Sequence, residues 1–528
     1  MEPSWLSLIP PLIVLVTACV FRKLYLSLLI GIMTAALIST SYSPAKSTVL
    51  IAERFYQYIS DKDSIYMYAF LIIIGCIIML ICTTGGISAF AHHMKKRFSS
   101  KRTVESSSLL LSALVGIDDY LNSITVGHVM QPIADRFGIA RTKLAYLLHA
   151  MSGPLVILVP ISSWAAVITT NLDSSGISLV ATKTTKILGD PFYVYLKTLP
   201  FIFYSLFTIF SVWYIVHRQL SYGPMHTDEA KAHKKAQSVS AETTTSSETY
   251  SLLDIIVPLV TLLCSVIIGI LYTGGYWLLG GNHSLIDAFK NNTQNSLVLV
   301  VASLITLGVT LILGYIRNKV RIEALPTIIR DGFLLMAPAI LMLILANTLG
   351  YILRFDLLTG DYLAHSFLGA LSVTFVPVMF FIITAITALL TGTSWGTMAL
   401  MLPIAIPMLT SMLALPIPAP IASIPILFPT LGAIFSGAVC GDQLSPLSET
   451  TIMVATSAGS SAFAHFFTQF PYAIPAFIAS ILSFLISGWY MTRPLWFNLS
   501  ISLLLGILAC IILLQILQKL WNRPITSK

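Results

Sequence analysis

Residues 116–127 read GIDDYLNSITVG and place two adjacent aspartates inside a mostly apolar part of the chain. Basic residues flank this part at Arg102 and Arg141. Lys and Arg beside membrane helices mark the cytoplasmic side, so both flanks are predicted to lie on that side. About forty residues separate them, which barely fits two crossings of about 20 residues each. The sequence therefore predicts a re-entrant hairpin near 104–134, lining a cavity, because irregular backbone at membrane depth is tolerated only in such a place.

The composition requires lipid around much of the chain. Of its 528 residues, 56% are hydrophobic and 10% are charged, whereas a soluble domain carries about 25% charged residues. The net charge of +8 comes from Lys and Arg in short clusters between apolar runs. Such clusters orient helices in a membrane, and here they predict an outside N-terminus and an inside C-terminus. They indicate membrane lipid as a partner and give no sign of nucleic acid.

Long apolar runs recur along the chain, and each is predicted to cross the membrane as a helix of about 20 residues. The segments are 5–21, 24–42, 66–84, 144–168, 195–216, 252–273, 296–316, 333–352, 366–390, 398–415, 420–440, 469–491 and 495–518. The predicted fold is all-α: a polytopic, multi-pass membrane protein with about 11–13 transmembrane helices.

Residues 217–250 form the one long polar stretch, rich in Ser, Thr, Ala, Lys and Glu. Because this composition cannot bury a core, we expect a flexible cytoplasmic linker. It separates a first membrane half, 1–216, from a second, 251–528. The second half contains predicted interrupted helices near 389–397 and 441–451. Interrupted helices in both halves of a transporter favour two inverted repeats with a binding site between them.

The acidic cluster within 116–127 is the first predicted site. A carboxylate at mid-membrane costs on the order of 3 kcal/mol, so such residues are functional hypotheses by default. Adjacent carboxylates repel each other, and a proton or a cation beside them relieves the repulsion. Asp118 and Asp119 both share a helical face with Asn122, and carboxylate and amide oxygens suit a hard cation. The alternative is an interfacial turn with solvated aspartates.

The second predicted site is GDQLSPLSETT at 441–451. Pro446 removes a backbone donor, which frees nearby carbonyls to face a cation. No Lys or Arg occurs from 398 to 492, which argues against the alternative of an ordinary exposed loop. The candidate ligands in this stretch are Asp442, Ser445, Ser448, Glu449, Thr450 and Thr451.

Two smaller groups of polar residues accompany these sites. Thr393 and Ser394 lie in TGTSWGT at 391–397, where flanking glycines suit an unwound segment that offers oxygens. Packing of small residues between helices is the alternative. His128 and His149 stand near the acidic cluster, either as proton relays or as hydrogen-bonded core histidines.

The motifs DDYLNSITVG at 118–127, GTSWGT at 392–397 and GDQLSPLSETT at 441–451 resemble signature segments of the NhaC-type sodium/proton antiporters, in the ion-transporter superfamily. The resemblance spans most of the chain in the right order. It implies inverted repeats with re-entrant hairpins, exchange of sodium for protons, and a location in the cell membrane, the bacterial inner membrane. It carries over as binding residues Asp118, Asp119, Asn122, Thr393, Ser394, Asp442, Ser445, Ser448, Glu449, Thr450 and Thr451. The chain departs from the family pattern at Glu449, where Asp is commoner, and at Ile452, where Asn is frequent.

We therefore expect a secondary transporter, not an enzyme, in which Asp118, Asp119 and Asp442 hold sodium and protons in turn. No cofactor is expected; sodium and protons are the transported ions. The sequence is compatible with a monomer or with a homo-oligomer. The alternative is a sodium- or proton-coupled carrier of organic acids or amino acids, which would need a cation or helix N-terminus for a carboxylate. An intramembrane aspartyl protease is disfavoured because its Gly-x-Gly-Asp segment is missing before Asp442.

Overall fold

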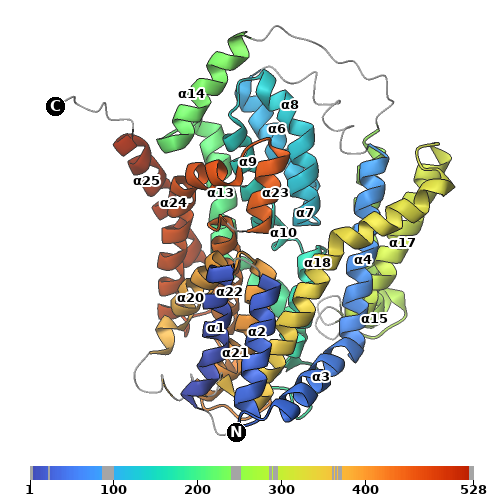
Figure 1. The fold of residues 1–528 in the computed structure, drawn as a ribbon, viewed down its shortest axis with the longest axis vertical. Coiled ribbons are helices and arrows are strands. Elements are labelled where there is room, and N and C mark those ends of the chain that lie inside the picture. The colour runs from blue at the N-terminus through green and yellow to red at the C-terminus, as the bar shows by residue number, and fades with distance from the viewer. Residues whose placement is uncertain are drawn as a thin grey trace.

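The structure is a computed structural model that describes residues 4–21, 24–85, 100–238, 251–284, 288, 295–359, 362, 366, 372–446 and 448–521. Most of the described chain is helical (Figure 1), which confirms the predicted all-α membrane fold. Many helices run along the longest axis of the molecule, and α14 (Gly223–Ser238) lies at its upper end in Figure 1.

Seven helices in the described part of the chain are long and apolar enough to cross a membrane. They belong to α4 (Lys62–Thr83), α15 (Leu253–Thr273), α17 (Asn295–Ile316), α20 (Val376–Thr391), α21 (Ser394–Met412), α24 (Ala462–Trp489) and α25 (Leu495–Trp521). Two bent pairs bring the number to nine if each pair is one span. These pairs are α2 (Leu24–Ser39) with α3 (Pro44–Ser60), bent by 119°, and α12 (Pro191–Thr198) with α13 (Phe203–Arg218), bent by 47°.

Long uninterrupted spans within the described ranges are fewer than the about 11–13 helices predicted from apolar runs, because several of those runs are divided. The run 144–168 is shared by α9 (Arg141–Met151), α10 (Gly153–Val156) and α11 (Ser163–Ser174). The run 420–440 is shared by η9 (Ile421–Ser423) and α22 (Leu427–Gln443). The remaining elements are η1 (Trp5–Leu8), α1 (Ile9–Phe21), η4 (Leu199–Phe201), η5 (Trp277–Leu279), η6 (Ile322–Ala324), α18 (Leu325–Tyr351), η7 (Ile352–Asp356) and η8 (Val373–Phe375).

The first interrupted region is a hairpin, as predicted near 104–134. Helix α6 (Lys101–Leu114) enters, and α8 (Gly127–Arg136) returns beside it (Figure 1). The turn between them holds α7 (Asp119–Leu121) and a π-helical segment, η3 (Asn122–Val126). At 1.5 Å per residue the 14 residues of α6 extend about 21 Å, which is short of the roughly 30 Å hydrocarbon layer. The acidic cluster therefore lies at the inner end of a half-length hairpin.

The second interrupted region joins α22 to α23 (Glu449–Ser457) through a non-helical segment. Helix α22 packs on α20 with backbone almost in contact, because a Cβ atom at Gly441 would lie only 2.1 Å from the carbonyl oxygen of Ala385. Small residues allow this close approach between membrane helices. Helix α20 itself ends at Gly392, whose φ of 72° is left-handed, and α21 begins two residues later.

The two interrupted regions pack on each other. The Ser457 Oγ atom donates a hydrogen bond of 2.6 Å to the carbonyl oxygen of Ser123, so α23 packs directly on η3. A Cβ atom at Gly127 would lie 2.0 Å from the same Ser457 Oγ atom, so this glycine is needed for the contact. The fold thus joins a break in the first half of the sequence to a break in the second half.

A small parallel sheet, not expected from the sequence, ties two loops together. Its strands are β1 (Ile177–Ser178), β2 (Ile187–Leu188) and β3 (Ala419–Pro420), in the order β1-β2-β3. Next to it the buried Arg354 donates hydrogen bonds to the carbonyl oxygens of Ser174 and Thr184. These two carbonyl groups, at the end of α11 and in the loop that follows it, thereby obtain hydrogen-bond donors.

Helix α14 occupies part of the stretch predicted as a flexible linker, 217–250, and the prediction is wrong for these residues. The Glu229 carboxylate pairs with Lys101 of α6 and lies 2.8 Å from the Lys143 Nζ atom of α9. Lys143 is buried and lies 2.9 Å from Glu105, which is also buried. Charge pairing with the first hairpin therefore holds α14 in place. The linker prediction considered only whether the stretch has apolar side chains to bury, and so it missed this contribution. Residues 239–250 of the predicted linker lie outside the described residues.

The buried ion pairs under α14 give a stability prediction. Replacing Lys143 by Met should destabilise the protein by about 3–5 kcal/mol, because Glu105 and Glu229 would be left buried without their countercharge. Thermal unfolding of the purified protein in detergent measures the effect. The exposed pair of Lys231 and Asp228 supplies the control: K231M should cost less than about 1 kcal/mol. Equal losses in the two variants would contradict this account of α14.

Candidate functional site

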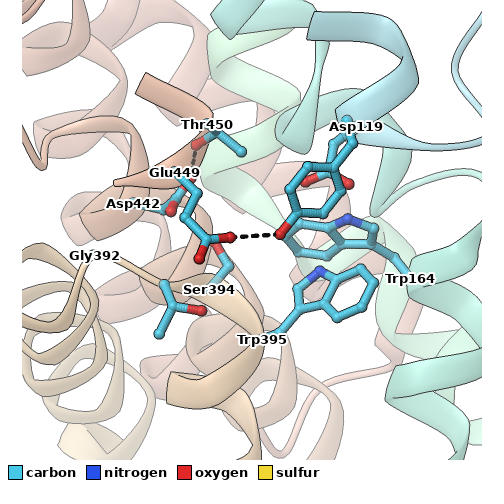
Figure 2. A pocket seen from close by; sticks show the side chains of 10 residues that line it. Asp119, Trp164, Gly392, Ser394, Trp395, Asp442, Glu449 and Thr450 are labelled. Atoms are coloured by element: carbon cyan, nitrogen blue, oxygen red, sulfur yellow. Dashed lines mark hydrogen bonds between the residues drawn. The ribbon is translucent and has the colours of Figure 1, made fainter. Parts of the chain in front are cut away.

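A small cavity lies where the first hairpin and α23 approach the break between α20 and α21 (Figure 2). Its lining comes from α7, α11, α21, α22, α23 and the break itself. The lining residues are Asp119, Tyr120, Trp164, Gly392, Thr393, Ser394, Trp395, Asp442, Glu449 and Thr450. The cavity thus gathers side chains that stand far apart in the sequence, from both predicted halves.

The first acidic cluster faces the cavity through one of its two aspartates. Asp119 lines the cavity and is 2% exposed, and its Oδ1 atom has no hydrogen-bond partner. Asp118 is 0% exposed and accepts a hydrogen bond of 2.7 Å from Ser163 Oγ of α11. The Asn122 side-chain amide donates to the carbonyl oxygens of Ser112 and Met151, at 2.9 and 3.0 Å. Asn122 therefore fastens the inner end of the hairpin to α9.

The second acidic cluster places Asp442 opposite the first. Asp442 is 8% exposed and accepts hydrogen bonds from Ser448 Oγ at 2.8 Å and from Thr450 Oγ1 at 2.5 Å. Ser448 is also the N-cap of α23, where its side chain accepts from the Thr451 backbone N–H. The end of α22 and the start of α23 are thus joined through the carboxylate of Asp442.

Tyr120 joins the first hairpin to α23 across the cavity. Its hydroxyl donates a hydrogen bond of 2.8 Å to Glu449 Oε2, which Figure 2 shows as a dashed line. Glu449 is the first residue of α23, and Tyr120 follows directly after Asp119 in α7. Tyr120 stands inside the motif quoted for the resemblance, but an aromatic residue gave no sequence signal for binding.

The remaining predicted residues divide into lining and supporting positions. Thr393 and Ser394 line the cavity: Thr393 is the N-cap of α21, and Ser394 Oγ donates to the Ala438 carbonyl oxygen at 3.1 Å. Thr451 Oγ1 donates to the carbonyl oxygen of Ser445 at 2.8 Å and so closes the turn before α23. The predicted residues that do not line the cavity are Asp118, Asn122, Ser445, Ser448 and Thr451.

Two tryptophans form an aromatic wall that the sequence-based prediction did not place in the site. The rings of Trp164 and Trp395 pack edge-to-face, with centroids 6.0 Å apart, and Tyr120 packs similarly on Trp395 at 6.4 Å. The buried Trp164 Nε1 atom has no hydrogen-bond partner. A signal for this wall existed in the sequence, because each tryptophan directly follows a serine, Ser163 or Ser394, whose side chain bonds near the breaks.

The charges of the cavity have one sign. Three lining residues carry a carboxyl group, and none of the ten lining residues of the described chain is Lys, Arg or His. A cavity lined by carboxylates in surroundings of low dielectric attracts cations. Within the described ranges, no three His, Cys, Asp or Glu side chains are grouped to hold a metal ion. Asp118, Asp119 and Asp442 thus do not form one shared ligand set in this conformation.

Comparison with known sequences points to one family. The model of the Na+/H+ antiporter family matches residues 179–489, more than half of the chain. This match includes Ser394, Asp442 and Glu449, whereas Asp119 lies before its first residue.

Three relatives with curated sequences differ in how much of the chain they share. An uncharacterized protein of Haemophilus influenzae is 28% identical over 493 residues, 92% of this chain and 91% of that protein. A malate-2H+/Na+-lactate antiporter of Bacillus subtilis is 34% identical over 108 residues, 20% of this chain and 21% of that protein. An uncharacterized Na+/H+ antiporter of Haemophilus influenzae is 31% identical over 121 residues, 23% of this chain and 24% of that protein.

Two solved structures share the fold. The YdaH transporter of Alcanivorax borkumensis superposes with a TM-score of 0.51 at 13% identity, covering 84% of this chain and 87% of that one. MtrF of Neisseria gonorrhoeae superposes with a TM-score of 0.50 at 14% identity, covering 85% of each chain. At such identities the likeness concerns the fold alone. With the family match and the apolar helices, the conclusion is that this chain belongs to the Na+/H+ antiporter family and is a multi-pass membrane transporter.

Proposed function

We propose that this transporter exchanges sodium for protons by competition at the carboxyl groups of the cavity. The observation that carries the proposal is the meeting of Asp119, Asp442 and Glu449 in a cavity whose lining residues include no basic side chain. Two of these groups, Asp119 and Asp442, are buried, and buried carboxyl groups are costly to ionise unless a cation or a proton neutralises them. Sodium and protons are therefore alternative occupants of the same acidic site.

The two aspartates have different surroundings, which suits different parts in the exchange. Asp442 accepts two hydroxyl hydrogen bonds, from Ser448 and Thr450, and these stabilise a carboxylate. Asp119 has an unpartnered Oδ1 atom in the cavity, with Asp118 next to it in the chain. An unpartnered buried carboxylate oxygen is costly, and a bound sodium ion or a proton removes that cost.

Transport requires the site to open to each side in turn. The predicted inverted repeats supply such a mechanism, in which one half rocks against the other around a central site. The Tyr120–Glu449 hydrogen bond crosses from the first hairpin to α23, so movement of one relative to the other would break it. In this proposal, occupation of the carboxyl groups controls whether that bond forms.

An organic acid is the rival cargo, because one relative is named as an antiporter of malate and lactate. An organic anion would bring further negative charge next to Asp119, Asp442 and Glu449, and no lining residue of the cavity is basic. A bare cation therefore fits the charge of the cavity better. Uptake of labelled malate and lactate into proteoliposomes, with and without a sodium gradient, would detect the rival activity.

Removing either cavity aspartate should abolish exchange. D119N and D442N are each expected to reduce sodium-driven proton movement about tenfold or more. A loss of about 1.4 kcal/mol in binding free energy weakens affinity tenfold, and hydrogen bonds to a charged group contribute more than that. A pH-sensitive dye inside proteoliposomes reports the flux. E323Q is the control, since Glu323 is exposed far along the chain in η6. Wild-type flux in both aspartate variants would overturn the assignment of the site.

The Tyr120–Glu449 bond gives a second prediction. Y120F and E449Q should each slow exchange, and the double variant should be no slower than the slower single variant, because both changes remove the same bond. Rates of sodium-driven proton flux in proteoliposomes measure the coupling. Y272F is the matched control, since the Tyr272 side chain is 68% exposed. Effects that simply add in the double variant would contradict a shared role.

A further inference from the structure

Two buried histidines lie beside the cavity without lining it. His149 belongs to α9 and His465 to α24, and both are fully buried. The His149 Nδ1 atom lies 3.1 Å from His465 Nε2 and 3.1 Å from Gln469 Oε1. The two rings are 5.3 Å apart between centroids. Their nitrogen atoms are therefore within hydrogen-bond distance in the interior of the protein.

The other nitrogen of His149 connects this pair to the cavity. His149 Nε2 lies 3.4 Å from Thr450 Oγ1, which in turn lies 2.5 Å from Asp442 Oδ2. A continuous line of polar atoms thus runs from Asp442 through Thr450 and His149 to His465. Each member of the line can both donate and accept a proton.

The far end of the line approaches the surface. His465 stands four residues after the exposed Ser461, the N-cap of α24, and four helical residues span about 6 Å. Beside this end, the exposed Arg141 donates a hydrogen bond to the Gly459 carbonyl oxygen, at 3.2 Å. This is the end of the molecule at which α9 begins and which carries α14 in Figure 1. The buried His465 ring lies against the backbone of Thr142, the second residue of α9.

We propose that His149 and His465 carry protons between Asp442 and the α14 face of the protein, by a route separate from that of sodium. The proposal rests on sodium/proton exchange as proposed above. Imidazole suits this task because one ring nitrogen can accept a proton while the other releases one. Sodium cannot follow the same line, because beyond Asp442 and Thr450 it consists of the packed, buried rings of His149 and His465, which do not line the cavity.

The transfer of one proton along the line leaves the number of protons on Thr450, His149 and His465 unchanged. The carboxyl O–H of Asp442 gives its proton to Thr450 Oγ1 as the Thr450 hydroxyl proton passes to His149 Nε2. The Nδ1 proton of His149 then moves to His465 Nε2. The buried His465 ring releases its Nδ1 proton to a water molecule that enters from the α14 face. Asp442 is left as a carboxylate and both rings are left as the other neutral tautomer, so reorientation of the rings and the hydroxyl resets the line.

The test separates proton movement from sodium movement. H149Q and H465Q, reconstituted in proteoliposomes, should lose sodium-driven proton flux by about tenfold or more, since a positioned proton-transfer group contributes about 10²–10⁴-fold. Exchange of labelled for unlabelled sodium at equal pH on both sides should stay within about twofold of wild type, because it needs no net proton movement. H226Q is the matched control, since His226 is exposed on α14, and it should change neither rate.

A rescue experiment addresses variants that are harmed by loss of packing. H465A should regain proton flux when imidazole is added to the buffer on the α14 side, because His465 lies close to that surface. Parallel loss of both rates in H149Q and H465Q, without rescue of H465A, would overturn the proposal and leave the pair a packing feature. Retention of proton flux in both glutamine variants would also overturn it. Wild-type protein without sodium-driven proton flux would refute the proposed function itself, before any histidine variant is measured.

Discussion

Interrupted helices inside an apolar protein leave backbone groups without helical partners, and this constraint shapes the whole site. Each unsatisfied group in a membrane interior costs several kcal/mol. The breaks therefore carry polar side chains that cap the helix ends: Ser162 caps α11, Thr393 caps α21 and Ser448 caps α23. Without these caps the broken helices that form the cavity would not be stable in lipid.

One capping residue and the neighbour of another also organise the carboxyl groups. Ser448 accepts from the backbone of α23 and donates to Asp442, and Ser163, which follows the cap Ser162, donates to Asp118. At Ser448, structural and chemical demands thus fall on one hydroxyl group. This sharing explains why stretches rich in serine and threonine accompany the acidic residues in both halves of the sequence.

The sequence alone predicted the parts of the structure in which polar residues interrupt apolar runs. The hairpin near 104–134 was predicted because Asp118 and Asp119 stand between two basic flanks that both mark the cytoplasmic side of the membrane. Six of the predicted site residues line the cavity. Features that depend on tertiary contacts were not predictable. Helix α14 has no apolar stripe and is held by Glu229, Tyr120 meets Glu449 only after folding, and His465 acquires meaning only beside His149. Hydrophobic periodicity carries no information about such contacts between polar residues that are distant in the sequence.

The close packing of α20 on α22 has a mechanical consequence. Gly437 and Gly441 let the two helices touch backbone to backbone, so neither can slide past the other without a steric clash. Ser394 adds a bond from the start of α21 to Ala438 of α22. Asp442 is consequently carried by a stiff frame of three helices, whereas Asp119 sits on a short three-residue helix beside a π-helical turn. The site thus has one wall with little freedom and one wall with more, and flexibility on the Asp119 side would move half of the cavity while the other half keeps its shape.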